Sequence, residues 1–387
     1  MIVSRRITLA TGVAGAVCLA LLVLAGLGNL TGFFRAYLLG YTFWLGLGLG
    51  SLGVLLVQFL TGGMWGLVTR RIFEAGTATL PMMAVLFIPM LFGLPELYAW
   101  ARPADVAADP VLQHKAVYLN LPFFVIRTIV YLVAWVLIGH NIRRWSAIED
   151  RGGHPLVLRR LQRLSIVGAL ILGLTVSFAA IDWLMSLDAD WFSTMYPPMV
   201  AMSFMLLALS FGTVLVALFG PDSVLVDLLA PQVFNDLGSL LLAITMLWGY
   251  LEYLQYLLMW AGNLSDEIPW YVRRSEGGWL PVAVAVGAIG FLLPGYLLLF
   301  RPLKRNRKTL AAIAGLLAGM QVVNVFWMVE PPFEPGGPFV DWLDVLSVLG
   351  FGALWLAVFA WQLAARPLVP RNDARLEPAL ETAHEPA

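Results

Sequence analysis

Residues 237–262 read LGSLLLAITMLWGYLEYLQYLLMWAG, an apolar run in which Glu252 is the only charged side chain. At about 1.5 Å per residue, a helix of this length is about 39 Å long, which exceeds the roughly 30 Å of hydrocarbon in a bilayer. Core helices and strands of soluble proteins do not need so long an apolar run. The stretch therefore predicts a transmembrane helix and indicates an α-helical membrane protein.

Apolar runs of similar length recur along the 387-residue chain, which is 60% hydrophobic and 12% charged, with a mean hydropathy of +0.82. Soluble domains are about one-quarter charged, so the excess apolar surface must face lipid. We predict an all-α integral membrane domain over residues 1–365 and a disordered cytoplasmic tail over 366–387. The ten predicted spans are 8–30, 37–68, 78–100, 117–139, 163–187, 194–219, 237–262, 279–300, 310–330 and 341–365.

The basic residues sort to one side of the membrane when ten spans are assumed. We call the side that holds the N-terminus side A and the opposite side side B. Of the 24 Lys and Arg residues, Arg127 lies within a span and eighteen fall on side A. The other five fall on side B, namely Arg35, Arg102, Lys115, Arg273 and Arg274. Because loops rich in Lys and Arg stay in the cytoplasm, both termini are predicted to be cytoplasmic.

Composition argues against several kinds of cofactor site. The single cysteine, Cys18, provides neither an internal disulfide nor the thiolates that an iron–sulfur cluster or zinc site needs. A b-type haem between helices needs axial histidines, but the four histidines fall in loops, at a helix end and in the tail: His114, His140, His154 and His384. We therefore predict that this chain binds no metal or haem. Its net charge of zero predicts no attraction to nucleic acid, and its main predicted partner is the lipid bilayer.

Seven ionisable side chains are predicted at membrane depth, at the end of a span or at its mouth. Such a group costs about 2.5–3.5 kcal/mol on insertion scales, so it is a candidate for function by default. Arg127 and Glu252 fall near the middle of the fourth and seventh spans, and Asp182 and Glu96 in the side-B halves of theirs. Glu330 ends the ninth span on side B, and Asp227 and Asp236 lie at the side-A mouth of the seventh.

Arg127 and Glu252 are expected at similar depth, which leaves two interpretations open. One is a structural ion pair that joins two helix bundles, and the other is a gate or relay on a proton path. The surroundings of Glu252 favour the relay, because polar side chains that can order water follow neighbouring stripes of one helix. These are Thr245, Trp248, Glu252 and Gln255 on one stripe and Tyr253, Tyr256 and Trp260 on the next, with Gln321 and Asn324 of the ninth span as further candidates.

Asp182 is expected about one turn from the side-B interface, where Trp183 follows it. One interpretation is a hydrated carboxylate with no special role. The other is a proton exit or quinone-proximal site formed by Asp182, Trp183 and Glu96.

Residues 48–53, GLGSLG, match the dinucleotide-binding fingerprint, but they lie inside an apolar helix. We reject this match because the fingerprint requires a strand before it and a helix N-terminus after it. Gly46, Gly50 and Gly53 instead predict the close approach of another helix. Gly62-Gly63, placed in the same predicted span, predicts a second close approach or a local kink.

Several short motifs resemble a known family when they are taken together. They are residues 58–66 (QFLTGGMWG), Arg70-Arg71 with Glu74-Ala75, residues 182–187 (DWLMSL), 191–194 (WFST), 236–238 (DLG), 248–256 (WGYLEYLQY) and 262–267 (GNLSDE). They resemble the ActF-type membrane subunit of alternative complex III, in the NrfD-like (polysulfide reductase membrane subunit) superfamily. The motifs cover about residues 37–275, and the ten-span plan covers the rest. The family often has a His where this chain has Phe59, which weakens the carry-over of a proton path at that end of the second helix.

The resemblance implies ten helices arranged as two four-helix bundles with two flanking helices, and no haem bound by the chain. It implies a bacterial inner-membrane complex that oxidises quinol and reduces an electron acceptor such as cytochrome c. The expected partners are an NrfD-like paralogue, an iron–sulfur subunit and a cytochrome c subunit, which carry the clusters and the c-type haem. The ActF type is thought to offer a proton pathway, for which Asp182, Glu252 and Gln255 are the matching candidates.

Four functions remain open from the sequence. The first is a non-catalytic, energy-coupling subunit of a quinol oxidoreductase that contributes a proton-conducting pathway. The second is a quinol-binding subunit, in which Asp182 or Glu96 accepts the quinol proton. The third is a secondary transporter, which inverted repeats with paired broken helices would favour, although no clear pair is seen. The fourth is a purely structural assembly subunit.

Overall fold

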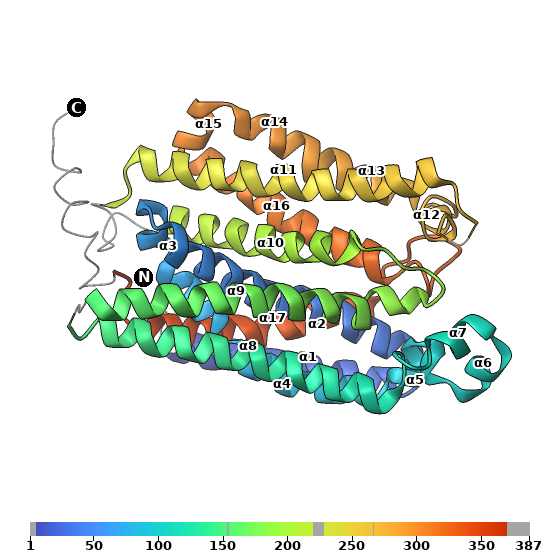
Figure 1. Cartoon of the computed structure of the whole chain (residues 1–387). Coiled ribbons are helices and arrows are strands. Elements are labelled where there is room, and N and C mark those ends of the chain that lie inside the picture. The colour runs from blue at the N-terminus through green and yellow to red at the C-terminus, as the bar shows by residue number, and fades with distance from the viewer. Residues whose placement is uncertain (1–4, 153–154, 220–227, 266, 370–387) are drawn as a thin grey trace.

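The computed structural model describes residues 5–152, 155–219, 228–265 and 267–369, and every regular element in these ranges is a helix. Ten helical segments are long and apolar enough to cross a membrane, and they run side by side between two ends of the molecule (Figure 1). The prediction of an all-α membrane protein with about ten spans is confirmed. Most of the predicted tail at 366–387 lies outside the described residues.

Most spans are single long helices, whereas the third and eighth are built from several shorter elements in a row, and further short helices lie at the ends of the molecule (Figure 1). The elements are α1 (Arg5–Gly26), α2 (Leu30–Thr61), α3 (Met64–Thr77), α4 (Leu80–Leu86), η1 (Ile88–Phe92), α5 (Leu94–Leu97), η2 (Ala99–Ala101), α6 (Pro103–Ala108), α7 (Pro110–Lys115), α8 (Leu121–Glu149), α9 (Pro155–Trp183), η3 (Met185–Asp188), α10 (Tyr196–Leu218), α11 (Pro231–Gly262), α12 (Pro269–Arg273), α13 (Leu280–Gly287), the π-helical η5 (Ala288–Leu292), α14 (Leu293–Leu299), α15 (Arg301–Arg305), α16 (Arg307–Val329) and α17 (Trp342–Ala364).

The long helices form two groups of four spans with two further helices beside them. One group contains α2, the segment α3–α4, α8 and α9, and the other contains α10, α11, the segment α13–α14 and α16. Helices α1 and α17 pack on each other, and α17 also packs on α2. The two groups meet where α2 contacts α10, and both of these helices are mostly buried inside the chain.

The contact between α2 and α10 depends on glycines, as the sequence predicts. A Cβ atom on Gly50 would lie 1.9 Å from the backbone oxygen of Phe204, and one on Gly46 would lie 2.4 Å from the Phe204 ring. No larger residue fits at either position without moving α10 away. Small residues let transmembrane helices approach closely and gain van der Waals contact, which is a main source of packing energy in lipid.

The boundary between the second and third spans was predicted wrongly. Gly62 and Gly63 neither kink a helix nor pack against one; they form the turn that ends α2 and starts α3, with φ angles of 72° and 99°. Positive φ angles favour glycine, since it lacks a Cβ atom. The third span is therefore Met64–Phe92, and Arg70 and Arg71 lie on α3 rather than in a loop.

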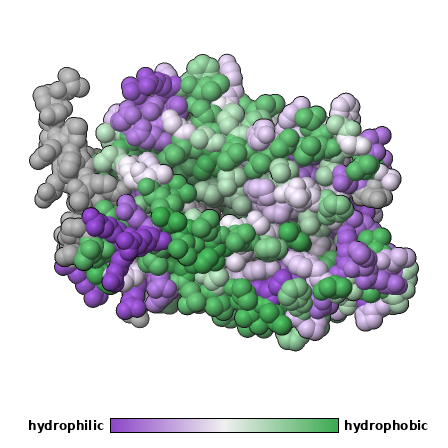
Figure 2. Space-filling view, viewed as in Figure 1, coloured by the Kyte–Doolittle hydropathy of each residue, from purple (hydrophilic) through white to green (hydrophobic). Residues whose placement is uncertain are grey.

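The two ends of the molecule differ from the middle in their surface chemistry. On the face shown in Figure 2, hydrophobic side chains spread over the middle and hydrophilic ones gather at both ends. The N-terminal end of α1, α3 and α15 lie at one end in Figure 1, which is side A, while α5, α6, α7 and α12 lie at the other end, which is side B. The apolar middle of this face matches the hydrocarbon layer of a bilayer.

Candidate functional site

Helix α11 brings the predicted polar stripe into the interior. Thr245, Trp248 and Gln255 are buried, and Glu252 is half-buried on the same stripe. Tyr253 is 61% exposed, so it lies on the outer face of the helix. The helix starts with a proline in its first turn and ends at Asn263, which adopts the left-handed conformation that terminates many helices.

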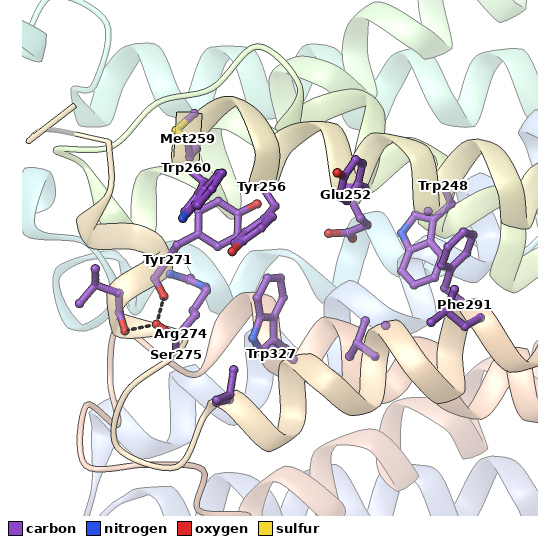
Figure 3. Close-up of a pocket in the computed structure, with 18 of the residues that line it drawn as sticks. Trp248, Glu252, Tyr256, Met259, Trp260, Tyr271, Arg274, Ser275, Phe291 and Trp327 are labelled. Carbon is purple, nitrogen blue, oxygen red and sulfur yellow. Dashed lines mark hydrogen bonds between the residues drawn. The ribbon is translucent and has the colours of Figure 1, made fainter. Parts of the chain in front are cut away.

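Glu252 lines a cavity of about 590 Å³ between α11, α12, the segment α13–η5 and α16 (Figure 3). Most of the wall is apolar or aromatic. The aromatic lining residues are Trp248, Tyr253, Tyr256, Trp260, Tyr271, Phe291 and Trp327. Tyr256 and Trp260 are 46% and 68% exposed, so the rim of the cavity reaches the outer surface of the protein. Tyr256 and Trp260 lie on the last two turns of α11, so this opening is near the side-B end of the span.

The Glu252 carboxyl group is poorly paired for a group at this depth. Its Oε1 atom is enclosed but receives no hydrogen bond from the described residues, and no described cation forms an ion pair with it. Buried polar atoms in proteins are almost always hydrogen-bonded to protein, water or ligand. The carboxyl group is therefore suited to bind a proton, water or a polar ligand group from the cavity.

Arg274 closes the side-B end of the cavity (Figure 3). Its guanidinium group stacks 3.7 Å from the centroid of the Trp270 ring, and its Nη1 and Nη2 atoms donate to Asp188 Oδ2 and to the Met328 carbonyl, each at 3.2 Å. Burial lowers the pKa of Arg274, while the adjacent Asp188 carboxylate opposes that shift. Burial also raises the pKa of Tyr271, and the charge of Glu252 adds to this rise. The cavity thus has a carboxyl group on one wall and a cation at one end.

Two further polar clusters lie in the same group of helices. Ser193, just before α10, donates a hydrogen bond to Gln255 Oε1. Ser203 of α10 donates to Gln321 Oε1 at 2.6 Å and accepts from Asn324 Nδ2 at 3.3 Å. The structure therefore joins the predicted candidates Gln321 and Asn324 to α10. Gln255 Nε2, Gln321 Nε2 and Asn324 Oδ1 are enclosed without a hydrogen-bond partner among the described residues, so each keeps an unused donor or acceptor.

Arg127 does not pair with Glu252, so the interpretation as an ion pair between these two residues is wrong. Its Nε and Nη2 atoms each donate to the Asp182 carboxylate at 2.9 Å, and Tyr131 donates to the same carboxylate at 2.9 Å. Its Nη1 atom donates to the Tyr118 carbonyl at 2.9 Å. Arg127 and Glu252 were expected at similar depth, but similar depth does not make them neighbours. Arg127 lies in the group of helices around α8 and α9, whereas Glu252 lies on α11 in the other group.

The other predicted residues lie apart from the cavity. Trp183 is buried among aromatic rings, 4.7 Å from Phe87 between centroids, and its indole donates to Thr128 Oγ1 at 3.3 Å. Glu96 is half-buried near the side-B end and accepts a hydrogen bond from Thr31. Asp236 is half-buried near the side-A end of α11 and accepts from Gln232 at 3.0 Å. The structure thus does not gather Asp182, Trp183 and Glu96 around one shared cavity among those described.

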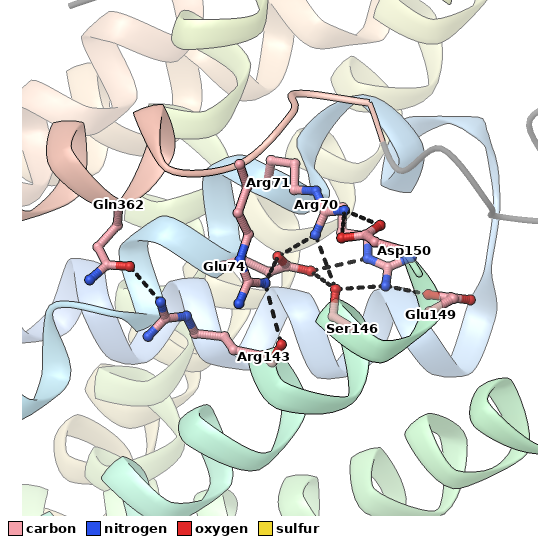
Figure 4. Close-up of polar contacts among 9 residues, drawn as sticks. Arg70, Arg71, Glu74, Arg143, Ser146, Glu149, Asp150 and Gln362 are labelled. Atoms are coloured by element: carbon pink, nitrogen blue, oxygen red, sulfur yellow. Dashed lines mark hydrogen bonds and ion pairs between the residues drawn. The ribbon is translucent and has the colours of Figure 1, made fainter. Parts of the chain in front are cut away.

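A network at the side-A end was missed by the sequence reading (Figure 4). Glu74 of α3 forms ion pairs with Arg70, Arg71 and Arg366, and Ser146 of α8 donates to Glu74 and accepts from both neighbouring arginines. The spacing of Glu74, three and four residues after the arginines, was the available signal, because such pairs face each other on a helix. The network joins α3, α8 and the residues after α17. Its contacts therefore indicate a structural role, in which it holds these segments together.

A second missed cluster lies at the side-B end, around Arg35 of α2. Its guanidinium group faces Glu330 at 3.0 Å and Asp344 at 3.8 Å, and it also donates to Glu334. Arg35, Glu330 and Asp344 are all buried. Sequence alone could not predict this cluster, because Arg35 is almost three hundred residues from the carboxylates in the chain.

No protein-family model matches the chain, and no curated protein matches it. The resemblance to the ActF-type subunit therefore depends on the short motifs and the helix plan alone.

Proposed function

We propose that the chain is a membrane subunit of a respiratory quinol:electron acceptor oxidoreductase of a bacterial inner membrane, resembling alternative complex III, and that it contributes a proton-conducting pathway. The observation that carries this proposal is the Glu252 carboxyl group, which lies at membrane depth on the wall of a 590 Å³ cavity without an ion-pair partner among the described residues. Ionisable groups are rarely kept at such depth unless they serve transport or charge transfer.

The surroundings of Glu252 provide what proton transfer needs. Thr245 and Trp248 lie toward side A on the same stripe of α11, and Gln255 lies toward side B. Enclosed polar atoms on these side chains can hold ordered water, and a chain of hydrogen-bonded water molecules conducts protons. Glu252 would bind and release the proton in the middle of this route.

In the proposed complex, partner subunits would provide the energy for transport. Moving one unit charge against 100 mV costs about 2.3 kcal/mol. The groups of His, Cys, Asp and Glu among the described residues do not have the geometry of a metal site. In the proposed complex, an iron–sulfur subunit, a cytochrome c subunit and an NrfD-like paralogue would carry out the electron transfer, and both termini of this chain would be cytoplasmic.

The test starts from the intact complex, purified from native membranes in mild detergent. Stoichiometric iron–sulfur and c-type haem signals are expected, and their absence would refute the assignment to an oxidoreductase. In proteoliposomes, Glu252→Gln should lower the number of protons translocated per electron while quinol oxidation continues. Tyr250→Phe is the matched control, because Tyr250 is an exposed residue of the same helix, two positions before Glu252, that does not line the cavity. An unchanged ratio in Glu252→Gln would refute the pathway and favour a structural subunit.

A second candidate function is supported by the shape of the same cavity. Its aromatic walls, its opening to the outer surface and its single carboxyl group suit an isoprenoid quinol, whose ring can donate a hydrogen bond to Glu252. For this second candidate we propose Glu252, rather than Asp182 or Glu96, as the carboxyl group that faces the quinol. A quinol site here predicts that a quinone-type inhibitor quenches the tryptophan fluorescence of the full chain and that Glu252→Gln weakens this quenching. Equal quenching in both proteins would contradict it.

A further inference from the structure

The cluster around Arg35 has fewer positive charges than negative ones. Among the described residues, one guanidinium group faces the carboxyl groups of Glu330, Glu334 and Asp344. Asp341, at the N-cap of α17, adds a further negative charge nearby. The neighbouring Arg274 does not balance these charges, because it binds Asp188 and the Met328 carbonyl instead. If every carboxyl group were ionised, the cluster would carry excess buried negative charge.

Burial of unpaired charge is costly, and carboxyl groups that share a site respond by keeping a proton. Of the three groups, Glu334 is 35% exposed in its side chain and accepts a hydrogen bond from Arg35, which favours its ionised form. Asp344 accepts a hydrogen bond at 2.9 Å from the backbone N–H of Asp341, which also favours the ionised form.

Glu330 differs from both of these residues. Its side chain is fully buried, and its oxygens receive no hydrogen bond from the described residues, although Oε2 faces Arg35 Nε at 3.0 Å. Oε1 has no partner of either kind among them, so it is the atom on which a proton is best placed. Burial raises the pKa of Glu330 to about 8, and the negative charge of Asp344 adds to the effect while Arg35 opposes it.

Glu330 also stands next to the Glu252 cavity. It follows α16 directly, three residues after Trp327, which lines that cavity. Residues three apart on a helix lie on the same face, about 4.5 Å apart along the axis. Gln321 and Asn324 lie deeper on α16, but at about 100° per residue Gln321 is turned about 180° from Glu330, so these amides do not share its face. Glu330 thus lies between the Trp327 wall of the cavity and the side-B surface, where Glu334 is partly exposed.

We propose that Glu330 is a proton-binding site, which holds one proton at neutral pH within the cluster of Arg35, Glu334 and Asp344 and releases it to water on side B. The bound proton follows from the charges and contacts of the cluster alone. The role of Glu330 as the exit of the route through Glu252 rests on the proposed function.

Infrared spectroscopy of the purified full-length chain tests the bound proton, because a protonated carboxyl group has a carbonyl stretch that a carboxylate lacks. The carbonyl band should titrate with a midpoint near the pKa of about 8 and should be lost in Glu330→Gln. Glu276→Gln, at an exposed glutamate of the side-B loop, is the matched control and should retain the band. The titration is carried out in a Glu252→Gln background as well, so that a proton on Glu252 is not mistaken for one on Glu330.

A second variant keeps the proposal falsifiable if Glu330→Gln does not fold. Asp344→Asn removes one neighbouring negative charge and should move the midpoint of the band to lower pH. A band that persists in Glu330→Gln, or a midpoint that is unchanged in Asp344→Asn, would overturn the proposal. These measurements need no partner subunit, so they are independent of the translocation experiment. The infrared result can support the Glu330 site even if Glu252→Gln leaves proton translocation unchanged. It can also contradict the site while Glu252→Gln lowers translocation.

Discussion

Asp182 and Glu252 are carboxyl groups inside transmembrane helices, but their surroundings differ. Asp182 is fully buried and accepts three hydrogen bonds of 2.9 Å, two from Arg127 and one from Tyr131. Glu252 lines a cavity and has no ion-pair partner among the described residues. A carboxylate at membrane depth is therefore not by itself a sign of proton transfer; its partners decide whether its charge is fixed or can change.

The difference has an energetic basis. A charge taken out of water loses several kcal/mol of solvation, and only a close opposite charge with good hydrogen bonds offsets this loss. Arg127 provides that charge for Asp182, and the rings of Tyr118 and Phe123 cover its guanidinium group with centroids 3.8 and 4.2 Å away. Glu252 lacks such compensation, so it can lower its free energy by binding a proton. The first site favours a fixed structure, and the second favours a change of charge.

The largest expected effect follows from removing the charge of Asp182. Asp182→Asn leaves Arg127 buried without its counter-charge, and loss of one partner of a buried pair typically destabilises a protein by about 3–5 kcal/mol. We expect a large drop in the thermal unfolding midpoint of the purified chain in detergent or nanodiscs.

The matched control is Asp105→Asn, which removes the same charge from the exposed pair of Arg102 and Asp105, whose side chains are 44% and 42% exposed. Exposed pairs contribute little, so this variant should change stability by less than about 1 kcal/mol. Equal midpoints for the two variants would mean that the Arg127–Asp182 pair does not stabilise the fold, and the comparison with Glu252 would lose its basis.

The sequence predicted the transmembrane helices better than it predicted which side chains meet between them. Ten spans followed from the length of the apolar runs, and the close approach at Gly50 followed from the small residues along α2. The turn at Gly62-Gly63 was missed because the residues on both sides of it are apolar. The hydropathy therefore stays high across the point where the chain turns from α2 into α3. Both glycines adopt positive φ angles, which favour glycine over other residues. The Gly-Gly pair was therefore the available sequence signal for a turn, although the hydropathy does not fall there.

The site was predicted only in part, for a related reason. The stripe through Glu252 and Gln255 belongs to a single helix, so its spacing could be read directly from the sequence. The pairs formed by Arg127 with Asp182 and by Arg35 with Glu330 join helices that are distant in the chain. The position of a residue along a helix gives the depth of its side chain in the membrane. Which side chain it meets also depends on where the helices lie beside one another, and helix packing alone determines that.

Glu330 provides an intermediate case, because it has a cation beside it but shares that cation with other carboxyl groups. Its pKa in the folded chain, about 8, lies above the ordinary value of 4.5. Its contribution to stability is therefore complete below about pH 4.5 and is lost as the pH rises through about 8, with a slope of at most about 1.4 kcal/mol per pH unit.

Thermal midpoints of the wild type and of Glu330→Gln, measured from pH 6 to pH 9, check this expectation. The wild type should lose stability relative to Glu330→Gln across this range, because only the wild type gains a buried negative charge. A difference between the two proteins that does not change with pH, or that grows in favour of the wild type as the pH rises, would contradict the assignment.

The smallest expected effect on stability belongs to Glu252→Gln. Because Glu252 has no cation to lose among the described residues, the substitution should change the unfolding free energy by less than about 1 kcal/mol. The thermal midpoint, measured beside that of Asp182→Asn, checks this directly.

A loss of stability as large as that of Asp182→Asn would show that Glu252 also stabilises the fold. A fall in proton translocation could then no longer be assigned to the proton that Glu252 binds. A stable variant with impaired translocation would instead separate the two carboxyl groups by role, since only one of them would be needed for folding.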